Sequence, residues 1–489
     1  MSKNIAIIGS GFSALSAACY LAKNGNSVSI FEKNKNVGGR ASQFHKDGFT
    51  FDIGPSWYWM PDIFERFYND FGKTASDFYD LVRLSPSYQI FYKNDKLEIP
   101  SSLDELYKLF DTIEPGSSTK LKSFLKSAKY KYDVGINEFV EKPSLSLTEF
   151  LDFRIVTSAF KLNMLNSLSS EVRSLFKDSR LIELLEFPVL FLGATPQKIP
   201  ALYSLMNYAD LALGTWYPMG GMHKIITAMS TIATSLNVKL HLNANVTEIR
   251  SQKNQATSII VHSEEHLSDV IISSADYHHT ETVLLAPDKR NYTSKYWEKR
   301  IMAPSSLLYY IGLNTRLTSI KHHNLFFDED FSVHATEIYE DPKWPTKPLF
   351  YVCCPSITDS SVAPKGCENV FLLMPLAPGI QDSEDMREKY FNIMIDRLEE
   401  RTCSQIKKAI IYKKSYCIDN FKNDYNAFKG NAYGLANTLS QTAILKPSLK
   451  NKRLRNLYYT GQLTVPGPGV PPSLISGRVV AKQVIDDLK

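Results

Sequence analysis

The sequence predicts an α/β fold with room for two domains. The chain has 489 residues, 44 % of them hydrophobic, which is enough to build more than one core. The nearly all-apolar run Asn4–Ile8 is typical of a buried parallel strand. Apolar residues then recur at helical spacing from 14 to 22, and a second strand-like run covers Ser27–Phe31. A strand, a glycine turn, a helix and a second strand in this order indicate a nucleotide-binding type of unit.

The composition argues against several classes of partner. Lysine and arginine together number 56 and the acidic residues 51, a net charge of only +5, and no arginine-rich tract or zinc-finger spacing occurs. We therefore expect no nucleic-acid partner. Aromatic residues make up 12 % of the chain, which suits a flat or elongated apolar ligand, although core packing accounts for most of them.

The cysteines and the apolar runs bear on location. The six cysteines form no CxxC pair, which indicates free thiols in a reducing compartment. The N-terminus runs into a strand without a signal pattern, and the apolar run 187–194 is far too short to span a bilayer. We expect a cytoplasmic protein that can attach peripherally to a membrane surface.

Gly9 and Gly11 stand between the first strand and the helix. Gly9 permits a tight turn, and Gly11 lets a pyrophosphate approach the backbone at the positive end of the helix. Ala14 takes the place of the third glycine in GxGxxG, where a small residue suffices for helix–strand packing. Glu32 closes the second strand and can accept hydrogen bonds from ribose hydroxyls. The pattern predicts a dinucleotide site.

Two further segments help to decide which dinucleotide binds. Residues 37–40 read VGGR; the glycine pair lets the backbone pass close to a cofactor, and Arg40 can reach a phosphate. Residues 51–61 read FDIGPSWYWMP, with a Gly-Pro turn followed by aromatic side chains. Tyr58 and Trp59 suit the wall of a ring-binding site, although packing would explain them equally well.

These motifs resemble the superfamily of FAD-containing amine oxidases and carotenoid desaturases. Glu32 followed by GGR and FDxGP fits it, as do WYPMGGM at 216–222 and NLYYTGQ at 456–462. The closing run VPGPGVPPSLISGR at 465–478 is similar to that of carotenoid desaturases and related isomerases. Similarity is greatest to the bacterial 1-hydroxycarotenoid 3,4-desaturases, with phytoene desaturases close behind.

The resemblance implies an FAD-binding Rossmann-like domain of the glutathione-reductase type, with a second α+β substrate domain inserted discontinuously. The FAD-binding domain would comprise residues 1–75, 217–300 and 450–489. The substrate and membrane-associating domain would comprise 76–216 and 301–449.

The resemblance also supplies the expected cofactor contacts. They are Gly9, Gly11, Phe12, Ser13, Ala14, Glu32, Lys33, Gly39, Arg40, Gly54, Pro55, Ser56, Val246, Gly461, Gln462, Gly469 and Val470. Ser13, Ala14 and Gln462 depart from residues common in the family, which should shift local contacts without abolishing binding. Because no cysteine follows Cys417, we expect noncovalent FAD. No general base can be identified, and no metal site is expected.

The implied activity is the introduction of a C–C double bond into an acyclic carotenoid, with or without a 1-hydroxyl group. FAD takes a hydride from one carbon while its neighbour loses a proton. Only one dinucleotide fingerprint is visible, so the electrons would pass to oxygen or a quinone. A phytoene desaturase, a redox-neutral isomerase, an amine-oxidase-type enzyme and a non-catalytic FAD-stabilised membrane scaffold remain alternatives.

Three segments have expected roles beside the cofactor. In 119–132 an apolar helical face opposes a face with Lys122, Lys126 and Lys129, which suits docking on an anionic leaflet or a solvated helix packed on its own domain. The apolar stretch 181–206 would frame a tunnel mouth or form core. The loop in 465–478 would turn beneath the flavin ring, and the helix after it, capped by Ser473, would direct its positive end at the N1–C2=O edge.

Overall fold

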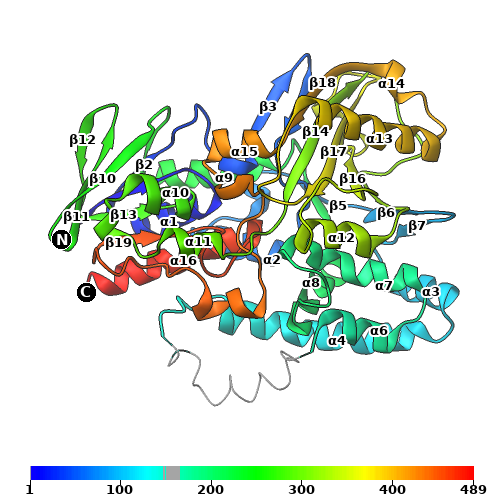
Figure 1. Cartoon of the computed structure of the whole chain (residues 1–489), viewed down its shortest axis with the longest axis horizontal. Helices are drawn as coiled ribbons and strands as arrows, with labels where there is room; N and C mark the ends of the chain where they lie inside the picture. The colour runs from blue at the N-terminus through cyan, green and yellow to red at the C-terminus, as the bar shows by residue number, and fades with distance from the viewer. Residues whose placement is uncertain (1, 147–148, 150–165) are drawn as a thin grey trace.

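The computed structural model describes residues 2–146, 149 and 166–489 (Figure 1). Its first sheet has five parallel strands in the order β19-β13-β1-β2-β9. In chain order this is the 3-2-1-4-5 arrangement of doubly wound nucleotide-binding folds, whose ligands bind at the carboxyl ends of the strands. The strands are β1 (Asn4–Ile8), β2 (Ser27–Phe31), β9 (Lys239–His241), β13 (Val270–Ser273) and β19 (Leu457–Tyr459).

Helices cover one face of this sheet and an antiparallel meander covers the other (Figure 1). Ile5, Ile7 and Ile30 pack against the helices α1 (Phe12–Lys23), α9 (His223–Ser235) and α16 (Val470–Asp487). Ala6 and Ile8 point to the other face, as the alternation of side chains along a strand requires. There they meet β10 (Val246–Gln252) and β11 (Gln255–Val261), to which β12 (Glu264–Leu267) is paired.

Helices α1 and α16 approach each other unusually closely at Gly477. A Cβ atom there would lie 2.3 Å from the carbonyl oxygen of Ser13 and 2.6 Å from Cβ of Ser16. Ser16 Oγ donates a hydrogen bond to the carbonyl of Leu474 over 2.8 Å. The C-terminal helix is therefore fixed against the start of the N-terminal helix, beside the Gly9–Gly11 turn.

A second, mixed sheet has seven strands in the order β18-β14-β17-β16-β15-β6-β7, antiparallel except for the β6–β15 pair. Its strands are β6 (Tyr88–Tyr92), β7 (Lys96–Ile99), β14 (Ser305–Leu313), β15 (His323–Phe327), β16 (Phe350–Cys353), β17 (Glu368–Leu376) and β18 (Ile410–Tyr416). One face packs against α13 (Glu384–Thr402), and the other contacts the helices around the apolar cavity and the hairpin of β3 (Gln43–Lys46) and β4 (Phe49–Asp52).

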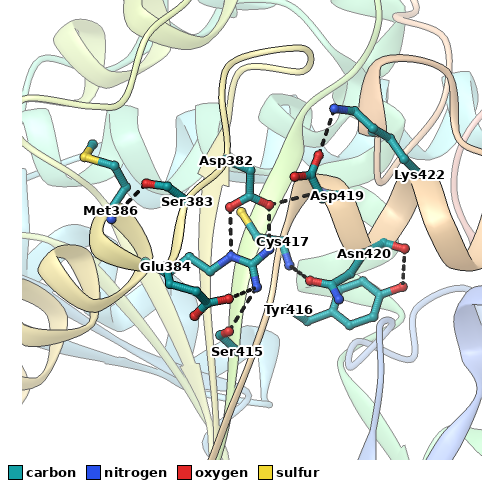
Figure 2. Close-up of polar contacts among 12 residues, drawn as sticks. Asp382, Ser383, Glu384, Met386, Ser415, Tyr416, Cys417, Asp419, Asn420 and Lys422 are labelled. Carbon is teal, nitrogen blue, oxygen red and sulfur yellow. Dashed lines mark hydrogen bonds and ion pairs between the residues drawn. The ribbon is translucent and has the colours of Figure 1, made fainter.

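A polar network fastens α13 to its surroundings (Figure 2). The Arg387 guanidinium donates to both carboxylate oxygens of Asp382, at 2.8 and 2.6 Å, and to Ser415 Oγ on β18 at 3.1 Å. Asp382 also accepts from the backbone N–H of Asp419, in α15 (Ile418–Tyr425). Because Arg387 and Asp382 are almost fully buried, this charge-assisted pair fixes the positions of α13, β18 and α15 relative to one another.

The remaining helices are distributed around both sheets (Figure 1). They are α2 (Pro61–Asp70), α3 (Leu103–Ile113), α4 (Ser117–Val134), α6 (Leu168–Leu175), α7 (Ser179–Glu186), α8 (Leu205–Asn207), α10 (Tyr277–His279), α11 (Ser294–Glu298), α12 (Phe331–Tyr339) and α14 (Ile406–Ala409). A short pair, β5 (Leu81–Arg83) and β8 (Trp216–Pro218), joins them to the first sheet's segments. In the described residues, no helix is long and apolar enough to cross a bilayer.

The two sheets draw their strands from different parts of the chain. All five strands of the first sheet come from within 1–75, 217–300 and 450–489, and the seven-stranded sheet comes from within 76–216 and 301–449. The β3–β4 hairpin packs on the seven-stranded sheet although it lies in the first of these ranges. Part of 76–216 lies outside the described residues, and the division into two domains stays a prediction.

Candidate functional site

One large cavity, of about 460 Å³, extends from the carboxyl ends of the first sheet into the substrate side. Ile8, Phe31 and Ser274 mark the ends of β1, β2 and β13 in its lining. Sixteen of the seventeen expected cofactor contacts line this cavity. Ala14 does not: it is completely buried in the core behind the loop, where its small size serves helix–strand packing.

The N-terminal turn has the geometry of a phosphate site. Gly9 has φ +93° and donates its N–H to the Phe31 carbonyl at 2.8 Å, while a Cβ there would touch the backbone of Ser274 at 3.4 Å. Gly11 is the N-cap of α1, and a Cβ on it would meet nothing within 4 Å. No side chain of the described residues caps this helix, so its first N–H groups remain available to an anion in the cavity.

Hydrogen bonds orient the side chain of Glu32, which directly follows β2. Its carboxylate is 5 % exposed and accepts from the Ser10 N–H at 3.0 Å, from Ser10 Oγ at 2.7 Å and from the Asn34 N–H at 2.9 Å. A carboxylate offers about four acceptor sites, so one remains for a ligand hydroxyl. Beside it, Lys33 Nζ donates to the carbonyl of Asn423 at 2.7 Å.

Arg40 offers an unused donor. Its guanidinium donates to the Asn431 carbonyl at 3.2 Å and lies 5.0 Å from the ring centre of Tyr425. Its Nε is buried without a partner among the described residues, and burial lowers the pKa of this guanidinium while the charge of Asp276 opposes that shift. Such a cation favours a nearby anion. The loop at Gly39 packs closely against the Gly9–Gly11 turn: a Cβ atom on Gly39 would lie 3.5 Å from Gly11 Cα.

The Gly54-Pro55-Ser56 turn forms another wall. A Cβ on Gly54 would lie 2.5 Å from the Arg40 carbonyl oxygen, so the close approach of these loops requires glycine. Ser56 Oγ accepts from the Tyr351 hydroxyl at 3.0 Å, and that hydroxyl is hydrogen-bonded to His323 Nδ1 at 2.6 Å. Tyr351 and Ser56 both line the cavity, so a buried polar chain reaches it from β15 and β16.

The aromatic wall differs in one residue from the expectation. Trp57 and Trp59 line the cavity, with ring centres 5.1 Å apart. Tyr58 is fully buried and its hydroxyl is hydrogen-bonded to Tyr79 at 3.1 Å, so its expected role as a wall residue is wrong. The backbone is extended here and Tyr58 bridges to Trp216, which turns alternate side chains to opposite sides.

The closing segment completes the site. Gly461, Gln462, Pro466, Gly469 and Val470 line the cavity, and α16 begins at Val470. Its N-cap is Gly469 and prolines occupy its first turn, where no N–H is lost. The expected cap at Ser473 is therefore wrong, because Gly469 is the N-cap and Ser473 already lies inside the helix.

Sequence reasoning missed several lining residues. Asp276 caps α10 and accepts from the N–H groups of Phe428 at 3.1 Å and His279 at 3.2 Å. Burial raises the pKa of Asp276 to about 6 and lowers that of His279 to about 4. Asn437 and Tyr433 also line the cavity. None belongs to a recognisable motif. Asp276 does follow the end of β13 at Ser273, and ligands bind where such strands end.

The segment 181–206 contributes both to the core and to the cavity lining, while its expected place at a tunnel mouth stays a prediction. Leu181, Leu184 and Leu185 are buried core residues. Further along, the segment supplies part of an apolar wall of the cavity, formed by Pro188, Leu192, Leu205, Met206, Leu308 and Leu373.

A second, small cavity of about 30 Å³ lies behind Gly54 and Ser56, large enough for one water molecule. Near it, a ring nitrogen each from His322 and His323 and the Cys353 sulfur lie within 4.8 Å of one another. Burial lowers the pKa of His322 to about 3. Nothing in the sequence pattern pointed to this cluster, because its members meet only across the β15–β16 pairing.

The fold and this cavity are typical of a flavoprotein that binds a dinucleotide. Comparisons with known proteins identify the family. The chain belongs to the flavin-containing amine oxidoreductase family, whose model matches residues 12–485. It is 38 % identical to a carotenoid 3,4-desaturase of Haloarcula japonica, covering 99 % of both chains. It is 30 % identical to a 4,4'-diapophytoene desaturase of Staphylococcus aureus, again over 99 % of both. The resemblance to carotenoid desaturases is confirmed.

The structural comparison confirms the fold class. An oxidoreductase from Methanosarcina mazei superposes with a TM-score of 0.65 at 16 % identity, over 98 % of this chain and 100 % of that one. The cofactor that membership of the family assigns is FAD. The site fits it: open space faces Gly11, Arg40 Nε has no partner in the described part of the chain, and Glu32 keeps acceptor capacity.

Proposed function

We propose that the protein is an FAD-dependent carotenoid desaturase that introduces a C–C double bond into an acyclic carotenoid in carotenoid biosynthesis. The observation that carries the proposal is the large cavity, which joins the Gly9–Gly11 turn and Glu32 to the apolar wall. A dinucleotide and a long apolar chain would thus share one continuous space. The two relatives, named as desaturases of this chemistry, support it.

Each part of the cavity has its own task in this reaction. FAD, when bound, supplies the hydride acceptor. The N-terminal turn, Glu32 and Arg40 would hold its phosphates and ribose. The apolar wall would orient the polyene and exclude water, and the hydrogen-bonded pair of Ser56 and Tyr351 would provide polar groups beside the reacting carbons. A 1-hydroxylated substrate that is desaturated at the 3,4-bond is the finer form of the proposal.

The charge of the lining argues against an amine substrate. Its carboxylates, within the described residues, are Glu32, Asp276 and Asp424, and they stand beside Lys33 and Arg40 at the nucleotide side. The apolar wall has no acid to pair with an ammonium group, and a buried unpaired charge is costly. We propose noncovalent FAD, since no cysteine is among the described residues that line the cavity, and oxygen or a quinone as the electron acceptor.

Expression in bacteria that accumulate defined carotenoids tests the proposal. Pigment extracts should show a red-shifted absorption spectrum and a mass lower by two hydrogens for one acyclic carotene or hydroxycarotene. Unchanged mass with altered double-bond geometry would instead show an isomerase. No change with any acyclic substrate, in cells that contain the flavin-loaded protein, would overturn the proposal and favour the scaffold alternative.

We also propose peripheral membrane association through α4. Lys122, Lys126 and Lys129 are exposed on one side of this helix, Lys129 in a surface ion pair with Asp133 at 2.6 Å, while Leu121 and Tyr132 are buried in the protein's own core. Since the apolar face is already covered, support comes from the basic face alone, which would attract an anionic leaflet. Such contact would let an apolar substrate leave the bilayer for the cavity.

A further inference from the structure

A buried lysine without an acidic partner lies next to the closing loop. Lys446 is 4 % exposed, and its Nζ donates to Asn437 Oδ1 over 2.6 Å. Among the residues that the structure describes, no carboxylate forms an ion pair with it. Burial accordingly lowers the pKa of Lys446 to about 7. A buried cation of this kind is costly unless a negative group compensates it.

The lysine and its asparagine pack directly on the loop that precedes α16. A Cβ on Gly467 would lie 2.9 Å from Asn437 Oδ1 and 3.1 Å from Lys446 Nζ. The loop residues on either side, Pro466 and Pro468, line the large cavity together with Asn437. Asn437 and Lys446 therefore lie next to the cavity. Gly467, on which they pack, is two residues before the N-cap Gly469.

The contacts of Asn437 determine which of its groups can meet a ligand. Its Oδ1 is occupied by Lys446, and its backbone N–H donates to the carbonyl of Leu192, another lining residue, at 2.7 Å. Its Nδ2 has no hydrogen-bond acceptor within the described part of the chain. The side chain therefore presents N–H donors to the cavity, and an oxygen or a nitrogen lone pair is the complementary partner.

Three positive features converge at this point: the amide donors of Asn437, the ammonium group of Lys446 and the N-terminus of α16. The carboxylates of the cavity lining lie instead around β2, α10 and α15. The electrostatics of this corner favour a group that carries or develops negative charge.

We propose that Asn437 and Lys446 form the site that stabilises the negative charge of the reduced flavin at its N1–C2=O edge. This inference rests on the proposed function, because it needs the flavin ring beside the 465–470 loop. A hydride brings two electrons and one proton, so the ring gains one negative charge. Asn437 contacts that edge, and Lys446 is a positioning residue that fixes the amide and supplies the compensating charge without giving up its proton.

The consequence is a higher reduction potential for the bound cofactor, which can be measured without any carotenoid. In purified, flavin-loaded Lys446→Met, the oxidised–reduced equilibrium should shift at least tenfold toward the oxidised form, about 30 mV for a two-electron couple. Lys446→Arg should stay within threefold of the wild type, and Asn437→Leu should resemble Lys446→Met. Dye-coupled reduction measures all of them.

Lys450→Met is the matched control. This lysine lies on the same segment but is part of a surface ion pair with Asp487 at 2.6 Å, so its removal should leave the potential unchanged. Should Lys446→Met not retain flavin, Lys446→Gln and Asn437→Ser report the same equilibrium. Wild-type potentials in Lys446→Met or Lys446→Gln would overturn the inference, as would an equal shift in Lys450→Met.

The outcome separates this inference from the proposed function. A wild-type protein that converts no carotenoid while Lys446→Met shifts the potential would refute the activity and keep the charge site. Carotenoid conversion by the wild type together with unshifted potentials in the lysine and asparagine variants would support the activity and refute the charge site.

Discussion

Ser10 Oγ donates a hydrogen bond to Glu32 Oε2 over 2.7 Å, and the Ser10 N–H donates to the same oxygen at 3.0 Å. Ser10, in the turn after β1, thus orients the carboxylate of Glu32, the residue after β2. Both residues line the large cavity, so the serine determines the direction in which the remaining acceptor site of Glu32 points. Substitutions of Glu32 and Ser10 should therefore weaken FAD binding to different degrees.

Glu32→Ala should purify without flavin, because it removes the acceptor for the ribose hydroxyls. Ser10→Ala should keep flavin but bind FAD about tenfold more weakly, since a hydrogen bond to a charged group contributes about 1.5 kcal/mol or more and the backbone donor remains. Titration of the apo-protein with FAD measures both. Stoichiometric flavin in Glu32→Ala would rule out the assigned ribose contact.

Gly11→Val should give a folded protein with at least a hundredfold weaker FAD binding. Gly11 has φ −74° and ψ −175°, which valine adopts without strain, and its Cβ position is open. The added side chain would therefore enter the cavity and leave the core intact. A normal thermal melt of the apo form combined with lost flavin absorbance checks this, and Gly11→Ala should be intermediate. Full flavin content in the valine variant would contradict it.

Gly477→Ala should destabilise the protein by about 1–3 kcal/mol, the usual cost of overpacking. Its Cβ would lie 2.3 Å from a backbone oxygen, which cannot move aside as a flexible side chain can. Thermal unfolding should show a clearly lower Tm. Gly135→Ala is the control: its φ is −57°, and its Cβ would make an ordinary 3.4 Å contact with Leu205. Equal melting temperatures for both variants would be inconsistent with the close helix packing.

Replacing Lys122, Lys126 and Lys129 together by Gln should weaken binding to anionic phospholipid vesicles at least tenfold, because each basic residue near such a surface contributes about 1 kcal/mol. Binding to neutral vesicles should not change. Vesicle co-sedimentation measures both. The matched control replaces Lys239, Lys253 and Lys299, which are exposed elsewhere. A similar loss in the control would show that net charge, and not α4, governs binding.

Local sequence patterns predicted which residues meet at the nucleotide end of the cavity, although their contacts with a cofactor stay predictions. The Gly9–Gly11 turn and the loop before α16 are specified by backbone demands that a few residue types satisfy, namely positive φ, close approach and a helix start. Those demands are visible in the sequence because they depend on neighbours along the chain.

The substrate side was much less predictable. Asn437, Tyr351 and Tyr433 reach the cavity from distant segments, and ordinary Asn and Tyr residues carry no sign of what a sheet of mixed strands will place beside them. The β3–β4 hairpin shows the same limit, because its contact with the seven-stranded sheet depends on Phe44 and Phe51 meeting Tyr310.

The edge position of β19 links the closing loop to the N-terminal turn. This strand pairs with β13 at one edge of the first sheet, and β13 pairs in turn with β1. The loop and helix that follow β19 line the cavity. Loss of this one pairing at the sheet edge would therefore displace the closing loop from the Gly9–Gly11 turn and open the cofactor site, although no cofactor contact had been changed.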